Sequence, residues 1–240
     1  MEKSKVVFIS KIRYAWLIAL LLPLQSCAFY YSAAPIEAWV VDAETGKPLE
    51  GVVVTANWQL KGGLEGGNPV GQMMVMEAVT DQNGRFHFPA WGPTRNISDG
   101  RIKDAAPQLL LFKSGYRYLN LFNDIAVTDR PGPSLKSDWN GKKIKMEKFK
   151  GGAKEYAQNV YDLNTAINNI YSFPPSAREE CLWKRIPRMV VEIHKMSLYF
   201  DAQGVKLKGW RGGQRLDKIS DLSGASNCGS VEAFFRGYLQ

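Results

Sequence analysis

Short apolar segments separated by turn residues constrain the fold of this chain more than any other feature. In Arg85-Phe86-His87-Phe88, polar and apolar side chains alternate, as in a strand with one buried face. The preceding Asp81-Gln82-Asn83-Gly84 is typical of a tight turn, because Asn and Gly tolerate positive φ. Comparable runs occupy 36–41, 52–58, 72–80, 109–113, 116–121 and 143–148. The pattern predicts a small antiparallel β-sandwich over 36–150.

The periodicity changes after Gly151-Gly152. Apolar residues then recur at helical spacing, which predicts a helix from Ala153 to Tyr171 that ends before Pro174-Pro175. The residues of this apolar stripe are Tyr156, Val160, Leu163, Ile167 and Ile170.

Two further helices are predicted in the last quarter of the chain. Ser176 and Glu179 fit a capping box, from which a helix should run towards Phe200 with a kink at Pro187. A short helix should follow from Ser230 to Tyr238. The fold class is therefore α+β: a small sandwich followed by two or three helices. Because 151–240 has few residues for a core of its own, we expect it to dock on the sandwich.

The amino terminus has the pattern of a secretory signal peptide. Four basic residues, Lys3, Lys5, Lys11 and Arg13, precede an apolar run over 14–24, which is shorter than the roughly 20 residues that span a bilayer. The next residues, Leu24-Gln25-Ser26-Cys27, resemble the lipobox of bacterial lipoproteins, although Gln25 replaces the usual small residue.

The lipobox resemblance implies that 1–26 is removed and that Cys27 carries the lipid. Residues 27–35 would then be a tether. The alternative is ordinary cleavage after Ser32-Ala33-Ala34, which the following Pro35 disfavours. Ala28 lacks the aspartate that retains related lipoproteins in the inner membrane. We therefore expect a lipid-anchored protein of the cell envelope, sorted to the outer membrane and facing the periplasm.

The cysteine count agrees with export. If Cys27 carries lipid, Cys181 and Cys228 remain as a candidate disulfide in an oxidising compartment. Two separate buried thiols are the alternative.

Three motifs of the first half suggest a family. They read Val41-Asp42-x-x-Thr45-Gly46-x-Pro48-Leu49-x-Gly51-Val52-x-Val54, then Thr80-Asp81-x-x-Gly84-x-Phe86-x-Phe88, then Leu111-x-Lys113-x-Gly115-Tyr116. Together they resemble the carboxypeptidase regulatory-like domain with its transthyretin-like fold, over less than half of the chain. The resemblance implies a non-catalytic sandwich with Gly46 and Gly84 in turns. It further implies that Val52, Val54, Phe86 and Phe88 point inward and that Tyr116 closes the core.

Signatures of catalysis and of metal binding are missing from the sequence. His87 and His194 have no neighbours at metal-ligand spacing, and no hydrolase motif occurs, so we expect no metal, no cofactor and no enzyme activity. The glycines of 61–67 read as a flexible loop. A run of lysines follows Trp139 and suits an edge strand better than a nucleic-acid site: Lys142, Lys143, Lys145, Lys148, Lys150 and Lys154.

These expectations combine into a non-enzymatic cell-envelope lipoprotein with a binding or scaffold role. Its partners would be the membrane, through the N-terminal lipid, and an envelope protein or glycan, but not nucleic acid. The loops 62–71 and 89–107 would form the binding surface. One alternative is an envelope hydrolase acting on peptidoglycan or peptide, in which Asp99, Asp104 and Glu192 would converge. Another is a lipoprotein component of a secretion or transport apparatus.

Overall fold

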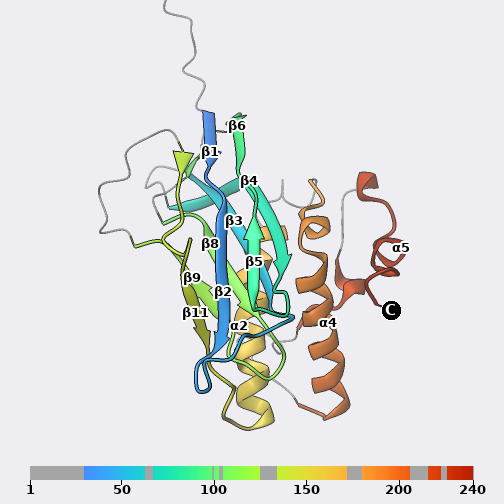
Figure 1. Cartoon of the computed structure of the whole chain (residues 1–240). Helices are drawn as coiled ribbons and strands as arrows, with labels where there is room; N and C mark the ends of the chain where they lie inside the picture. Colours follow the sequence, from blue (N-terminus) through green and yellow to red (C-terminus); the bar gives the residue numbers. More distant parts are fainter. Residues whose placement is uncertain are drawn as a thin grey trace, which may run out of the picture.

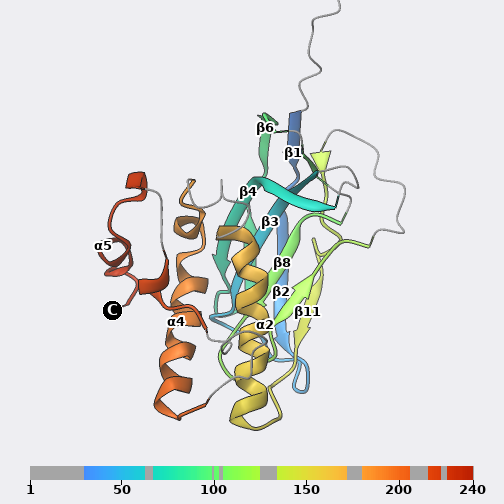
Figure 2. The same cartoon turned by 180° about the vertical axis from the view of Figure 1, so that it is seen from behind.

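The protein is a β-sandwich with helices against one of its faces, as the computed structural model shows (Figures 1 and 2). The structure describes residues 30–62, 67–98, 100–102, 105–124, 134–171, 180–205, 216–222 and 226–239. The predicted α+β class is confirmed.

The largest sheet has the strand order β4-β3-β8-β9, and β7 also pairs with β3. All of its pairings are antiparallel. The strands are β3 (Val53–Gly62), β4 (Asn68–Val79), β7 (Arg101–Ile102), β8 (Gln108–Phe112) and β9 (Leu119–Leu121).

Two three-stranded sheets complete the β part. One has the order β11-β2-β5, where β2 is antiparallel to β5 and parallel to β11. The other has the order β10-β1-β6. Their strands are β2 (Ile36–Asp42), β5 (Arg85–Phe88) and β11 (Lys143–Met146), then β1 (Tyr30–Ala33), β6 (Trp91–Arg95) and β10 (Ser134–Leu135).

Strand β3 takes part in both cores of the molecule because successive side chains point to opposite faces. Val54, Ala56 and Trp58 lie in the core between the sheets, with Phe86 and Phe88 from β5. Val53 lies instead in a second core, between the large sheet and the helices. The inward positions predicted for β3 and β5 are therefore confirmed.

The helices pack on the outer face of the large sheet, as predicted. The second core joins Val53, Leu110 and Phe112 of the sheet to the apolar faces of α2 (Ala153–Tyr171) and α4 (Pro187–Ala202). Helix α2 has the predicted bounds. The remaining helical segments are η2 (Leu182–Arg185), η3 (Ile219–Asp221), η4 (Ser226–Cys228) and α5 (Val231–Phe235).

The prediction of a kink at Pro187 is wrong. Pro187 is the first residue of α4, and the 3₁₀ turn η2 precedes it. Proline suits this position, because the first amide of a helix has no intrahelical acceptor and needs no N–H. The predicted capping box of Ser176 and Glu179 lies outside the described residues.

The predicted tether over 27–35 is also corrected in part, because Tyr30–Ala33 is strand β1. This strand pairs with β6, and Trp91 of β6 meets Trp58 edge to face, with 5.4 Å between ring centroids. The supposed loop over 89–107 thus contains β6 and β7. Likewise, β3 and β4 extend into the predicted loop over 62–71, where two register shifts accommodate the glycine-rich sequence.

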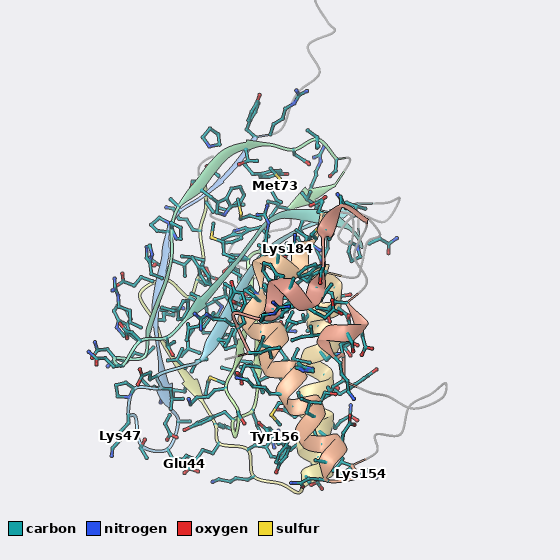
Figure 3. All side chains as sticks on the ribbon, turned by 90° about the vertical axis from the view of Figure 1, so that its right-hand side faces the viewer. Glu44, Lys47, Met73, Lys154, Tyr156 and Lys184 are labelled. Carbon is teal, nitrogen blue, oxygen red and sulfur yellow. A yellow bond between two sulfur atoms is a disulfide. The ribbon has the colours of Figure 1, made fainter. Side chains whose placement is uncertain are left out.

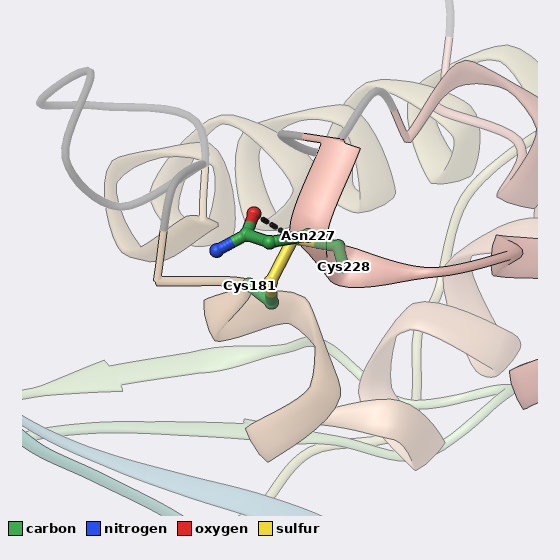
Figure 4. Close-up of a disulfide and its surroundings, with 3 residues drawn as sticks. All are labelled: Cys181, Asn227 and Cys228. Atoms are coloured by element: carbon green, nitrogen blue, oxygen red, sulfur yellow. Dashed lines mark hydrogen bonds between the residues drawn. A yellow bond between two sulfur atoms is a disulfide. The ribbon is translucent and has the colours of Figure 1, made fainter.

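The disulfide between Cys181 and Cys228 is confirmed, with 5.7 Å between the two Cα atoms (Figure 4). It joins the turn before η2 to the segment that leads into α5. Asn227 lies beside it, with its Oδ1 3.8 Å from the sulfur of Cys228.

Candidate functional site

A cleft of about 530 Å³ lies where the large sheet meets α4 and the C-terminal turn. Three segments meet there. The sheet contributes the start of β3 and the ends of β4 and β8, the helix contributes its first half, and residues 237–238 form the third wall. The lining residues are Gly51, Val53, Val79, Lys113, Ser114, Arg188, Val191, Glu192, Lys195, Gly237 and Tyr238.

Three valines supply the apolar part of the cleft. Val53 and Val79 are directly paired across β3 and β4, so their side chains share one face of the sheet. Val191 lies on α4 and is buried. The other side chains of the lining are polar or charged, so the valines form a small apolar area in a mainly polar cleft whose volume suits a small molecule.

Three cationic side chains enter the same cleft. The ammonium of Lys113 donates to the carbonyl oxygen of Glu50 at 2.8 Å. Lys195 pairs with Glu192 one turn earlier on α4, at 2.9 Å. Arg188 is exposed, and within the described part of the chain its guanidinium makes no hydrogen bond or salt bridge. Because Glu192 is the one carboxylate among these lining residues, the cleft carries an excess of positive charge.

Helix α4 is held in place by a carboxylate from the sheet. Glu77 of β4 accepts the backbone N–H groups of Arg188 and Met189, each at 2.9 Å. No side chain at the N-cap position does this, so Glu77 caps the helix from a distant part of the sequence. Burial raises the pKa of Glu77 from 4.5 to about 7, against the opposing effect of these N–H bonds and of Arg188.

The turn that contributes Lys113 and Ser114 is tied to both long helices. The hydroxyl of Ser114 lies 3.7 Å from the sulfur of Met196 on α4. The backbone N–H of Gly115 donates to the hydroxyl of Tyr156 on α2 at 2.6 Å. Figure 3 shows Tyr156 near the lower end of the helices, at the same end of the molecule as Glu44 and Lys47.

The third wall of the cleft depends on aromatic packing and on the disulfide. Phe235 is fully buried, and its ring contacts Trp183 of η2 and Tyr238. Cys228 and its bond to Cys181 lie a few residues before α5. Gly237 and Tyr238 are therefore linked to the core through this short helix.

The residues that the sequence singled out are scattered in the structure. Glu192 lines the cleft, whereas Cys27, Asp99 and Asp104 lie outside the described residues. His87 is exposed on β5, and the Nδ1 of His194 lies 3.5 Å from the amide of Ile219. In the described ranges, no group of three metal-binding side chains occurs.

The lysine run behaves as an edge strand should. On β11, Lys143 and Lys145 point to solvent while Ile144 and Met146 are buried. Beyond the strand, Lys148 and Lys150 form ion pairs with Asp42 and Glu44 of the first turn.

No local pattern in the sequence indicates the cleft itself. Its walls come from residues near 51, 79, 113, 190 and 237, so no local spacing brings them together. The one usable signal is that Arg188 and Lys195 fall on the same face of the predicted helix, since they are seven residues, or two turns, apart.

No protein-family model matches the chain, and no curated protein matches it. Among solved structures, 3-chlorocatechol 1,2-dioxygenase from Rhodococcus opacus is similar over 52% of this chain and 63% of its own, with 16% identity and a TM-score of 0.31. Catechol 1,2-dioxygenase from an Acinetobacter species is similar over 52% and 55%, with 17% identity and a TM-score of 0.29. This chain spans less than two thirds of the length of either enzyme.

The expected function is corrected by this finding. The similar structures are dioxygenases, which overturns the expected non-enzymatic binding or scaffold role towards an envelope protein or glycan. The finding does not bear on the lipid anchor. That role and its two alternatives are withdrawn, and the absence of enzyme activity is not established. TM-scores of 0.31 and below do not assign a dioxygenase activity to this chain either. Among the described helices, none is long and apolar enough to cross a membrane.

Proposed function

We propose that the protein binds a small organic anion in the cleft, outside the cytoplasm, while a lipid on Cys27 tethers it to a membrane. The observation that carries the proposal is the meeting of three cationic side chains with a small apolar area formed by three valines. The ligand class that fits is an apolar body with one carboxylate or phosphate group.

The charge arrangement favours an anion over a neutral ligand. Lys113 and Lys195 already have one partner each, but each ammonium has three donors and can make further bonds. Arg188 offers a guanidinium whose paired N–H groups match a carboxylate or a phosphate. The hydroxyl groups of Ser114 and Tyr238 can add weaker bonds at the rim.

The location outside the cytoplasm is supported by two independent features. The first thirteen residues and the apolar run after them read as a signal peptide, and Leu24-Gln25-Ser26-Cys27 resembles a lipobox. The Cys181–Cys228 disulfide suits an oxidising compartment, since cytosolic thiols are kept reduced. Sorting to the outer membrane, as Ala28 implies, belongs to the same proposal.

The sandwich itself we assign to the transthyretin-like type of the carboxypeptidase regulatory-like domain. The three motifs that carry this resemblance meet in space. Asp42 accepts the backbone N–H groups of Glu44 and Thr45 in the first turn and the hydroxyl of Tyr116 at 3.0 Å. Gly84 follows the second motif's Asp81 with a φ of 70°. The Asp42–Tyr116 bond joins the first motif to the third, and the backbone N–H of Val52, which donates to the hydroxyl of Thr80 at 2.8 Å, joins the first to the second.

Calorimetric titration with phenyl phosphate and benzoate tests the binding proposal, with benzyl alcohol as the uncharged control. We expect both anions to bind and the alcohol not to bind. Arg188→Ala should weaken the binding of phenyl phosphate about 10- to 100-fold, the range expected for losing a charge-assisted hydrogen bond. Lys145→Ala, on the far sheet, should bind like the wild type. The proposal that the cleft binds an anion would be wrong if Arg188→Ala bound phenyl phosphate as tightly as the wild type, or if neither anion bound.

A further inference from the structure

The end of the molecule where the chain enters β1 has two strongly exposed apolar side chains. Tyr30, the first residue of β1, is 59% exposed, and Ile97 is 92% exposed. Isoleucine is among the residues that are most often buried, so this degree of exposure at a loop tip is unusual.

The two residues belong to the same end of the molecule. Tyr30 pairs with Arg95, the last residue of β6, and Ile97 follows two residues later. Figure 1 shows the free ends of β1 and β6 side by side at the top of the molecule. Tyr30, Ile97 and the exposed Arg95 are called the β1–β6 tip below.

Ile97 is held outward by a defined turn. The side-chain amide of Asn96 donates to the carbonyl of Gly100 at 2.6 Å, and its oxygen accepts the N–H of Ser98 at 3.0 Å. The hydroxyl of Ser98 in turn accepts the N–H of Gly100 at 3.1 Å. These bonds satisfy the loop internally and leave the side chain of Ile97 in solvent.

The length of chain between the lipid and β1 decides what covers this tip. Only three residue steps separate Cys27 from Tyr30, which is about 10 Å of fully extended chain. The headgroup layer on each side of a bilayer is roughly 5–8 Å thick. A lipid on Cys27 would therefore hold Tyr30 within about 10 Å of the acylated residue, which is in the headgroup layer or directly next to it.

We propose that the β1–β6 tip docks on a phospholipid surface, with Tyr30 and Ile97 among the headgroups and Arg95 against lipid phosphates. This inference rests on the lipid anchor of the proposed function and adds a fixed orientation to it. Tyrosine favours the membrane interface, and an arginine there meets anionic headgroups. The acyl chains on Cys27 would supply the attachment, and the tip would add the contacts that fix the orientation.

The orientation places the cleft away from the membrane. The cleft lies at the Val53 end of β3. The other end of β3 pairs with β7, which follows the β1–β6 tip in the sequence. The seven residue steps from Val53 to Leu60 alone span about 23 Å. The ligand would thus enter from the aqueous side, and the bilayer would not cover the cleft.

Depth-dependent fluorescence quenching on the full mature lipoprotein tests the docking. The protein is reconstituted into vesicles of phosphatidylethanolamine and phosphatidylglycerol that contain nitroxide-labelled phospholipid. Ile97→Cys carries a nitrobenzoxadiazole label. Lys47→Cys, in the exposed first turn at the opposite end, is the matched control. If Cys27 is acylated, its sulfur is a thioether, and because the other two cysteines are bonded to each other, only the introduced thiol reacts.

We expect strong quenching and a blue-shifted emission at position 97, and neither at position 47. Mass spectrometry of the same sample reports whether Cys27 carries acyl chains. With acylation present, equal quenching at the two positions, or none at 97, would overturn the docking and leave the anchor standing. Absence of acyl mass would overturn the anchor and the docking together.

Discussion

At the scale of single residues, Glu77 links the sheet to the helices through two hydrogen bonds from the start of α4. Burial raises its pKa from 4.5 to about 7, so between these pH values the folded protein binds a proton that the unfolded chain releases. The contribution of Glu77 to stability is therefore complete below pH 4.5. It declines as the pH rises towards 7.

The variant Glu77→Gln should flatten this dependence. It cannot titrate, so the fall in unfolding free energy between pH 4.5 and 7 should shrink by roughly 1–3 kcal/mol. A shift of one pKa unit corresponds to about 1.4 kcal/mol, and partial exposure of the side chain reduces the effect. Urea unfolding at a series of pH values measures this change in unfolding free energy, and Glu50→Gln, at an exposed position, is the control. If the unfolding free energy of Glu77→Gln changes with pH as it does in the wild type, Glu77 is not the group that causes the pH dependence.

Two glycines provide a matched test of how tightly the sandwich closes. Gly46 and Gly84 have φ values of 68° and 70°, so alanine is strained at both. A Cβ at Gly84 would lie 2.3 Å from the carbonyl oxygen of Val40, whereas at Gly46 it would meet nothing within 4 Å.

We expect Gly46→Ala to lower the unfolding free energy by about 1–2 kcal/mol, the cost of the left-handed conformation. Gly84→Ala adds a clash with backbone and should lower it on the order of 2–5 kcal/mol. Thermal unfolding of the two variants measures the difference. If both variants lose the same unfolding free energy, the backbone around Gly84 shifts to accommodate the added methyl group at no further cost.

Local rules predict some of these residues and not others. The Asn83-Gly84 turn and the inward Phe86 and Phe88 follow from residue type and alternation, which act over a few positions. In the sequence, by contrast, Glu77 is simply a polar residue within a predicted strand. Its partner is the start of a helix more than a hundred residues later, and no local pattern records that contact.

At the scale of secondary-structure elements, the short helix α5 and its disulfide hold one wall of the cleft. The bond joins residues 47 apart and would contribute about 4 kcal/mol in the chain-entropy model. The rings of Trp183, Phe234 and Phe235 pack beside it.

Replacing both cysteines, Cys181→Ser with Cys228→Ser, should therefore lower the unfolding free energy by about 3–4 kcal/mol. It should also weaken the binding of phenyl phosphate, because the wall formed by Gly237 and Tyr238 is less restrained. Ser230→Ala is the control. It removes only the N-cap of α5, where the serine hydroxyl accepts the N–H of Ala233, and should cost about 1 kcal/mol. If the double variant binds phenyl phosphate as tightly as the wild type, the disulfide does not hold this wall of the cleft in place.

Elements with strong periodicity are predictable, and those fixed by distant contacts are not. Helix α2 has its predicted bounds because its apolar stripe is regular over five turns. Strand β1 has only four residues and exists because β6 and β10 flank it. The parallel pairing of β11 with β2 likewise depends on the whole sandwich, since these strands are far apart in the sequence.

At the scale of the whole molecule, we propose that opposite ends of the sandwich have different tasks. In this proposal the β1–β6 tip faces the membrane, and the cleft faces the aqueous side. Electrostatic attraction contributes to both, so salt should affect both. Binding of phenyl phosphate should weaken as the sodium chloride concentration rises, and calorimetry at several salt concentrations measures this. If the affinity for phenyl phosphate does not change with salt, the cationic side chains do not contribute to its binding.

Mapping the bound anion by NMR tests the central claim, the anion site between sheet, helix and C-terminal turn, most directly. Phenyl phosphate is titrated into the isotope-labelled protein, and the backbone amide shifts are followed. We expect saturable shifts at Ser114, Val191 and Gly237, which belong to three different walls, and none at Arg95 of the membrane-facing tip. Shifts confined to other surfaces, with these three amides unmoved, would contradict the proposed site.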